Sequence, residues 1–95
     1  MSYIIKTKIA GVFKYPDAKP IMKGMQPGTL FKWKAEPDNP YDPNAIELFV
    51  AGEHDWVKCG YIPKAVASSL TTNRISAIVK GAESFDAIDI TTTGE

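Results

Sequence analysis

One proline-rich segment constrains the fold of this chain more than any other feature. Pro37, Pro40 and Pro43 fall within the nine residues from Glu36 to Asn44. Each proline lacks a backbone N–H and fixes its own φ, so the segment can be neither the interior of a helix nor a central β-strand. It is therefore predicted to be a stiff surface loop with regular structure on both sides.

Short alternating segments flank this loop and predict β-strands. Along residues 3–10, Ile5, Thr7 and Ile9 share one face and lysines occupy the other, which is typical of a half-buried strand. The same kind of pattern predicts five further strands, over residues 29–34, 45–50, 56–62, 75–80 and 85–91.

A single short helix is predicted between the fourth and fifth strands. It covers residues 64–70, with Pro63 at its start and Asn73 as its stop signal. Six strands and one short helix indicate a mostly β fold, a small OB-like, partly open barrel. With 95 residues the chain is expected to form one domain, residues 1–95.

The composition limits where such a chain could work. Its longest apolar stretch has four or five residues, so no segment is expected to span a bilayer. The first residues lack a signal-peptide pattern. One cysteine, Cys59, cannot form an internal disulfide and is interpreted as a small buried hydrophobic residue. A cytoplasmic location is expected.

Groups that carry catalysis or bind metals are scarce in the sequence. The one histidine, His54, falls in a predicted hairpin turn, and neither His-x-x-His nor Cys-x-x-Cys occurs. Asp38, Asp42 and Asn44 have part of the spacing of a calcium loop, but prolines and Phe49 occupy other positions that such a loop requires. We therefore expect no enzymatic activity, no metal ion and no cofactor.

Charge is unevenly distributed although the net charge is zero. Residues 1–34 contain seven lysines and one aspartate, whereas residues 35–95 contain four basic and ten acidic residues. This indicates either a charged face or solvated lysines that protect sheet edges. Several aromatic side chains lie next to loops, some with lysines nearby. Proteins that bind a single nucleic-acid strand use aromatic rings to stack on bases and cationic side chains to contact the backbone. From the pattern alone, both a nucleic-acid-binding and a structural interpretation stay open.

The segment from Glu36 to Ile46 reads Glu-Pro-Asp-Asn-Pro-Tyr-Asp-Pro-Asn-Ala-Ile and resembles the signature of the HIRAN family. Residues 9–12 resemble the opening Ala-Gly-Val element of that family, and residues 59–64 resemble its Gly-Tyr-Ile/Val-Pro-Lys turn. The resemblance extends over roughly residues 4–91. One departure is Ala35, where members often have arginine.

The resemblance implies a DNA-binding module that recognises the 3′ end of a single strand by its free hydroxyl. Asp42 would accept a hydrogen bond from the hydroxyl and repel a phosphate, and Tyr41 would stack on the terminal base. Lys64 would meet a backbone phosphate. Asn39 is expected to hold the loop by an Asx-turn. The other residues implied in the site are Tyr61, Tyr15, Lys14 and Phe85.

The implied partner is a single-stranded DNA 3′ end, in DNA repair or replication or in the processing of phage or mobile-element DNA. Family members occur alone or fused to helicase-like ATPases and nucleases, so a separate helicase or nuclease is a second expected partner. One alternative is a small β-barrel that binds a protein partner through the same aromatic groove. Another is a purely structural or oligomerising domain. Salt dependence separates DNA binding from peptide binding, because phosphate contacts release counterions.

Overall fold

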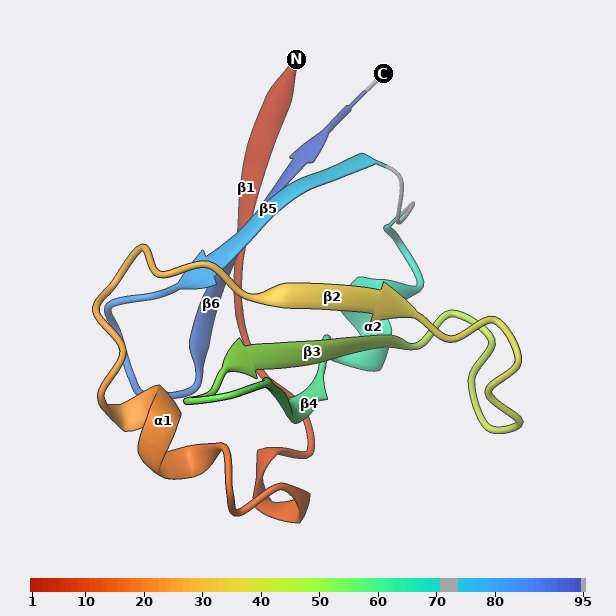
Figure 1. Ribbon diagram of the computed structural model, residues 1–95. Coiled ribbons are helices and arrows are strands. Elements are labelled where there is room, and N and C mark those ends of the chain that lie inside the picture. The colour runs from red at the N-terminus through yellow and green to blue at the C-terminus, as the bar shows by residue number, and fades with distance from the viewer. Residues whose placement is uncertain (71–73, 95) are drawn as a thin grey trace.

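The computed structural model describes residues 1–70 and 74–94, and two antiparallel β-sheets dominate it (Figure 1). One sheet has the strand order β1-β6-β5 and the other β2-β3-β4. The six strands in the described part of the chain are β1 (Ser2–Lys8), β2 (Lys32–Ala35), β3 (Ile46–Ala51), β4 (Trp56–Tyr61), β5 (Ile75–Lys80) and β6 (Ala87–Thr93). The mostly β fold predicted from the sequence is confirmed.

Two short connections join the sheets without closing them into a barrel. On one side Ala10 and Tyr61 exchange backbone hydrogen bonds of 2.8 and 3.0 Å. On the other side the segment before β2 pairs with β5, where the N–H of Phe31 donates to the carbonyl of Ile78 at 2.8 Å. The chain therefore crosses from one sheet to the other at Phe31, and β2 begins three residues later than the alternation predicts.

The core lies between the two sheets and follows the predicted alternation. On β3, Ile46, Leu48 and Val50 are all buried, as expected for residues that share one face. Cys59 is fully buried, which confirms its interpretation as a small hydrophobic residue. The other buried apolar residues are Ile9, Ala18, Met22, Phe31, Ala45, Ile62, Ala67, Ile75, Ile78, Ala87, Ile88 and Ile90.

Gly60 allows the close approach between the sheets. Its φ is 147°, and a Cβ at this position would lie 2.5 Å from Cγ2 of Ile9 and 2.6 Å from the carbonyl oxygen of Ala10. Only glycine combines this backbone conformation with so little space. The contact brings residues 10–11 alongside the end of β4, and this is where the candidate site lies.

Helical structure differs from the prediction of one helix. Besides α2 (Lys64–Ala67), the chain forms a 3-10 helix at Val12–Lys14 and the helix α1 (Lys19–Lys23). The sequence predicted no helix in the segment of α1, so the prediction of a single helix was wrong. Pro20 lies in the first turn of α1, where a missing N–H costs nothing.

Some element ends also differ from the prediction. The helix α2 ends at Ala67 instead of residue 70, and its expected stop, Asn73, lies outside the described residues. The last strand begins at Ala87 instead of Phe85, because the preceding turn is held by Lys80. The buried ammonium of Lys80 donates to the carbonyls of Gly81 and Ser84 at 2.8 and 2.6 Å.

Candidate nucleic-acid interface

The proline-rich loop between β2 and β3 is folded by its own hydrogen bonds. Its ends meet where the N–H of Glu36 donates to the carbonyl of Ala45 at 2.9 Å. Inside the loop, Oδ1 of Asn39 accepts the N–H groups of Tyr41 and Asp42 at 2.8 and 3.0 Å, while its Nδ2 donates to Oε1 of Glu36 at 3.1 Å. The expected Asx-turn at Asn39 is therefore confirmed.

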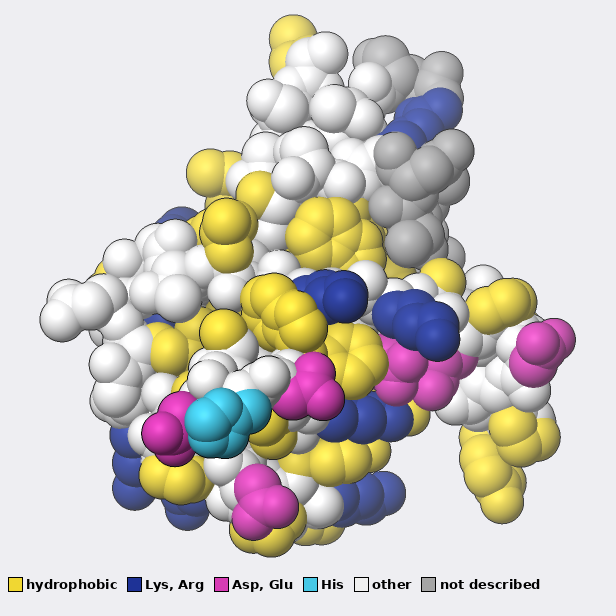
Figure 2. All heavy atoms as spheres, in the orientation of Figure 1, with side chains coloured by type: hydrophobic (Ala, Val, Ile, Leu, Met, Phe, Trp, Pro, Cys, Tyr) yellow, Lys and Arg dark blue, Asp and Glu magenta, His cyan; other side chains and the backbone are white. Residues whose placement is uncertain are grey.

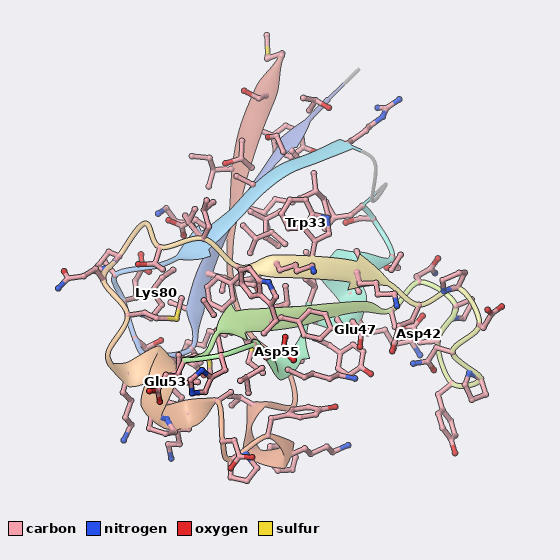
Figure 3. The ribbon with its side chains drawn as sticks, viewed as in Figure 1. Trp33, Asp42, Glu47, Glu53, Asp55 and Lys80 are labelled. Carbon is pink, nitrogen blue, oxygen red and sulfur yellow. The ribbon has the colours of Figure 1, made fainter. Side chains whose placement is uncertain are left out.

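This loop presents Tyr41 and Asp42 differently. The ring of Tyr41 is exposed, with 90% of the residue accessible to solvent. Asp42 is half-buried at the base of the loop (Figure 3), and its Oδ1 accepts the N–H of Asn44 at 2.9 Å. No described residue donates to Oδ2 of Asp42, so this oxygen can accept a hydrogen bond from a ligand.

A groove of about 400 Å³ lies beside the loop. Besides the loop, it is lined by the segment after β1, the end of β4 and the start of α2. Six of the seven residues implied by the sequence line it together: Lys14, Tyr15, Tyr41, Asp42, Tyr61 and Lys64. The remaining lining residues are Ala10, Gly11, Asn39, Ala45 and Ile62.

The seventh residue, Phe85, lies outside this groove. Its half-buried ring packs against the core, and the ammonium groups of Lys19 and Lys23 lie 5.5 and 5.8 Å from the ring centroid. The structure thus separates Phe85 from the other six residues.

The two lysines of the groove are free to meet an anion. Among the described residues, no carboxylate oxygen lies within 4.0 Å of Nζ of Lys14 or Lys64. Both side chains are exposed. Lysines with no carboxylate partner on the protein offer their full charge to a phosphate.

The other N-terminal lysines are spread over several surfaces instead of one face. Lys6 pairs with Asp89 at 3.4 Å on the outside of the β1-β6-β5 sheet. Lys32 lies over the ring of Trp56, 5.6 Å from its centroid. In Figure 2, dark-blue side chains lie in the middle of the β2-β3-β4 face and again beside α1 at the lower edge. Of the seven lysines in residues 1–34, Lys14 lines the groove and the other six lie elsewhere.

A β-bulge in β4 determines which side chains support the groove. Phe49 pairs with Lys58, but its neighbour Leu48 pairs with Gly60, so Cys59 is an extra residue on β4. After the bulge the alternation is reset. Lys58 and Tyr61 consequently point to the same face, although they are three residues apart in the sequence.

Lys58 is the centre of a polar cluster beneath the tyrosines, which sequence reasoning missed. Its Nζ donates to the hydroxyl of Tyr61 at 2.7 Å and pairs with Oε2 of Glu47 at 3.1 Å and Oε2 of Glu36 at 4.0 Å. It also lies 5.3 Å from the centroid of the Tyr15 ring. The signal that could have found this cluster is Gly60, since an isolated glycine in a strand pattern suggests a bulge.

The cluster shifts the pKa values of its members. Burial lowers the pKa of Lys58, but hydrogen bonds with Tyr61 and Glu47 outweigh burial and raise it above its ordinary value of 10.5. Burial raises the pKa of Glu36, but hydrogen bonds with Asn39 and Tyr61 and the charge of Lys58 bring it below 4.5. Both groups are therefore charged at neutral pH, and the cluster links the proline-rich loop to the opposite side of the groove.

Three other features raised by the sequence are His54, a possible metal site and a possible membrane span. His54 is an exposed turn residue, with 89% of its side chain accessible. Within residues 1–70 and 74–94, no group of three or more His, Cys, Asp and Glu side chains could hold a metal ion. None of the described helices has the length and apolar character needed to cross a membrane.

The family model of the HIRAN domain matches residues 3–81. The chain belongs to the HIRAN domain family. The match includes all six groove residues and the proline-rich loop, and it confirms the resemblance seen in the sequence. Comparison with curated proteins gave no significant match, and comparison with solved structures gave none either.

Membership of the family gives a general function to the groove. HIRAN domains are DNA-binding modules and not catalytic ones, so the assignment supports nucleic-acid binding by this chain. An exposed aromatic ring, a free carboxylate oxygen and two unpaired lysines in one groove suit that role.

Proposed function

We propose that this HIRAN domain binds the 3′ end of single-stranded DNA in the groove beside the proline-rich loop. The observation that carries the proposal is the pair formed by Tyr41 and Asp42. An exposed ring stands next to a carboxylate whose Oδ2 has no described donor, and both line a groove that also contains Lys14 and Lys64.

Asp42 selects the hydroxyl in this proposal. A carboxylate only accepts hydrogen bonds, so Oδ2 binds a terminal 3′-OH and repels a terminal phosphate. Its Oδ1 is already engaged with the N–H of Asn44, which fixes the direction in which Oδ2 points. The half-buried position of Asp42 strengthens both the attraction and the repulsion, because the local dielectric constant is lower than in water.

The other groove residues bind the rest of the terminal nucleotides. Tyr41 offers the terminal base a stacking surface, and Tyr61 and Tyr15 line the same groove. Lys14 and Lys64 contact the phosphates on the 5′ side of the terminal nucleotide. Phe85 is not part of this proposal, since it lies outside the groove.

This function would place the protein where free 3′ ends arise. DNA repair, DNA replication and the processing of phage or mobile-element DNA all generate such ends. A helicase or nuclease that acts on the same 3′ ends would be a second partner.

The decisive experiment compares two oligonucleotides that differ only at the 3′ end. We expect the wild-type protein to bind a short single strand with a 3′-OH more tightly than the same strand with a 3′-phosphate, as measured by fluorescence anisotropy. Asp42→Asn should bind both ends with similar affinity, because the amide no longer repels the phosphate. The loss of discrimination should exceed the loss of affinity for the 3′-OH strand.

A 5′-phosphorylated strand with a 3′-OH is the matched control, since it has the same charge as the 3′-phosphate strand. Equal affinity of the wild-type protein for the two phosphorylated strands would contradict end recognition. Binding that is insensitive to salt would instead favour a protein partner in this groove.

A further inference from the structure

A basic surface formed by the 3-10 helix and α1 adjoins the groove, because Lys14 belongs to both. Lys14 and Tyr15 line the groove, and the chain continues from them directly into α1, where the N–H of Ala18 donates to the carbonyl of Tyr15 at 3.1 Å. Lys19 and Lys23 lie on α1, one helical turn apart. Phe85 lies beneath both of them.

This surface, which we call the α1 surface (Lys14, Lys19 and Lys23 with Phe85), carries a net positive charge. Among the described residues no carboxylate oxygen lies within 4.0 Å of the three ammonium groups. The nearby carboxylate of Asp86 accepts the hydroxyl of Ser84 at 2.7 Å. Residues 11–25 contain these three lysines and one acidic residue, Asp17.

The face of the β2-β3-β4 sheet differs from the α1 surface in its charge. It also presents lysines next to aromatic rings, with Lys32 over Trp56. However, this face also carries Glu47 and Glu36, which pair with Lys58. These carboxylates reduce the net positive charge of the face, so the α1 surface is the better complement to a polyanion.

We propose that the α1 surface binds the phosphodiester backbone of the nucleotides that precede the 3′ end. This extends the proposed end recognition, on which it rests, from the terminal nucleotides to a longer single strand. Lys19 and Lys23 contact successive phosphates from their positions beside the ring of Phe85. The strand thus leaves the groove along the 3-10 helix and α1 and not across the β2-β3-β4 sheet.

The test measures how affinity depends on salt for two lengths of single-stranded DNA, a 3-mer and a 12-mer, each with a 3′-OH. For the 12-mer, Lys19→Gln/Lys23→Gln should reduce the slope of log affinity against log salt by about 1.4, because each phosphate contact on a single strand contributes about 0.7. For the 3-mer the slope and affinity should be unchanged. Lys19 and Lys23 are exposed, so the variant should keep the melting temperature of the wild type.

Lys32→Gln/Lys34→Gln is the matched control, with the same change in charge on exposed residues of β2. It should leave the 12-mer slope as in the wild type. A 12-mer slope that is unchanged in Lys19→Gln/Lys23→Gln would overturn the proposal, as would a length-dependent loss in the β2 control. End recognition is judged separately, by the preference of the wild-type protein for the 3′-OH over the 3′-phosphate on the 3-mer.

Discussion

Tyr41 and Asp42 are neighbours in the chain but have different constraints. The N–H groups of both residues are held by one acceptor, Oδ1 of Asn39. Asp42 also uses a carboxylate oxygen to hold Asn44, whereas the ring of Tyr41 is 90% exposed. A substitution of the Tyr41 side chain therefore tests binding with little effect on folding.

Tyr41→Ala should weaken binding of a 3′-OH single strand by ~1–3 kcal/mol, the range for loss of one stacked base. The melting temperature should stay close to that of the wild type, since the exposed ring contributes little to the core. Anisotropy titration and thermal unfolding measure the two quantities. A melting temperature that falls strongly with unchanged binding would contradict the stacking role, and Tyr41→Phe should retain binding because stacking needs only the ring.

At the scale of single elements, the bulge in β4 makes the groove possible. It turns Lys58 and Tyr61 to one face, opposite Phe49 and Glu47 of β3. The ion pair between Lys58 and Glu47 is largely shielded from water, with side-chain exposures of 28% and 11%. Removing one member leaves the other charge without its partner.

Lys58→Met should lower the free energy of unfolding by ~1–3 kcal/mol, because the buried carboxylate of Glu47 loses its donor. The double variant Lys58→Met/Glu47→Leu should recover most of that loss, since the buried carboxylate is removed together with its partner and only the more exposed Glu36 loses an ion pair. Denaturant unfolding of the two variants measures both values. A double variant as unstable as the single one would show that packing and not charge pairing gives Lys58 its importance.

Features formed by residues close together in the sequence could be predicted, whereas features that depend on pairing between distant segments could not. The proline-rich loop is local, so its prolines already indicated a stiff surface loop, and the family resemblance pointed to Tyr41 and Asp42 within it. The cluster around Lys58 depends on the register between β2, β3 and β4, and a one-residue bulge decides it. The alternation alone would place Lys58 and Tyr61 on opposite faces. Likewise α1 has only five residues, too few for a helical period to be visible.

At the scale of the whole molecule, the single cysteine reports on opening of the core. Cys59 is fully buried on β4 between the two sheets. Burial raises the pKa of its thiol from 9.0 to about 12. The reactive thiolate is therefore suppressed in the folded protein and becomes available only when the structure opens.

Labelling of Cys59 by an aromatic disulfide reagent at mildly alkaline pH should be slow in the native protein and fast in denaturant. We expect the native labelling rate to follow the population of the open state. Lys58→Met should then be labelled faster, by a factor that matches its loss of stability. Rapid labelling of the stable wild-type protein would contradict burial of the thiol in solution.

The closed proline-rich loop has a consequence for the kinetics of binding. Its ends are tied by the hydrogen bond from Glu36 to Ala45, and its turn is held by Asn39. A strand that arrives meets a loop already in its final shape, so no conformational step slows the encounter. Association rates should then be nearly the same for all ends that share a charge, and the dissociation rate should carry the preference. A favoured end would be one that stays longer, not one that is found faster.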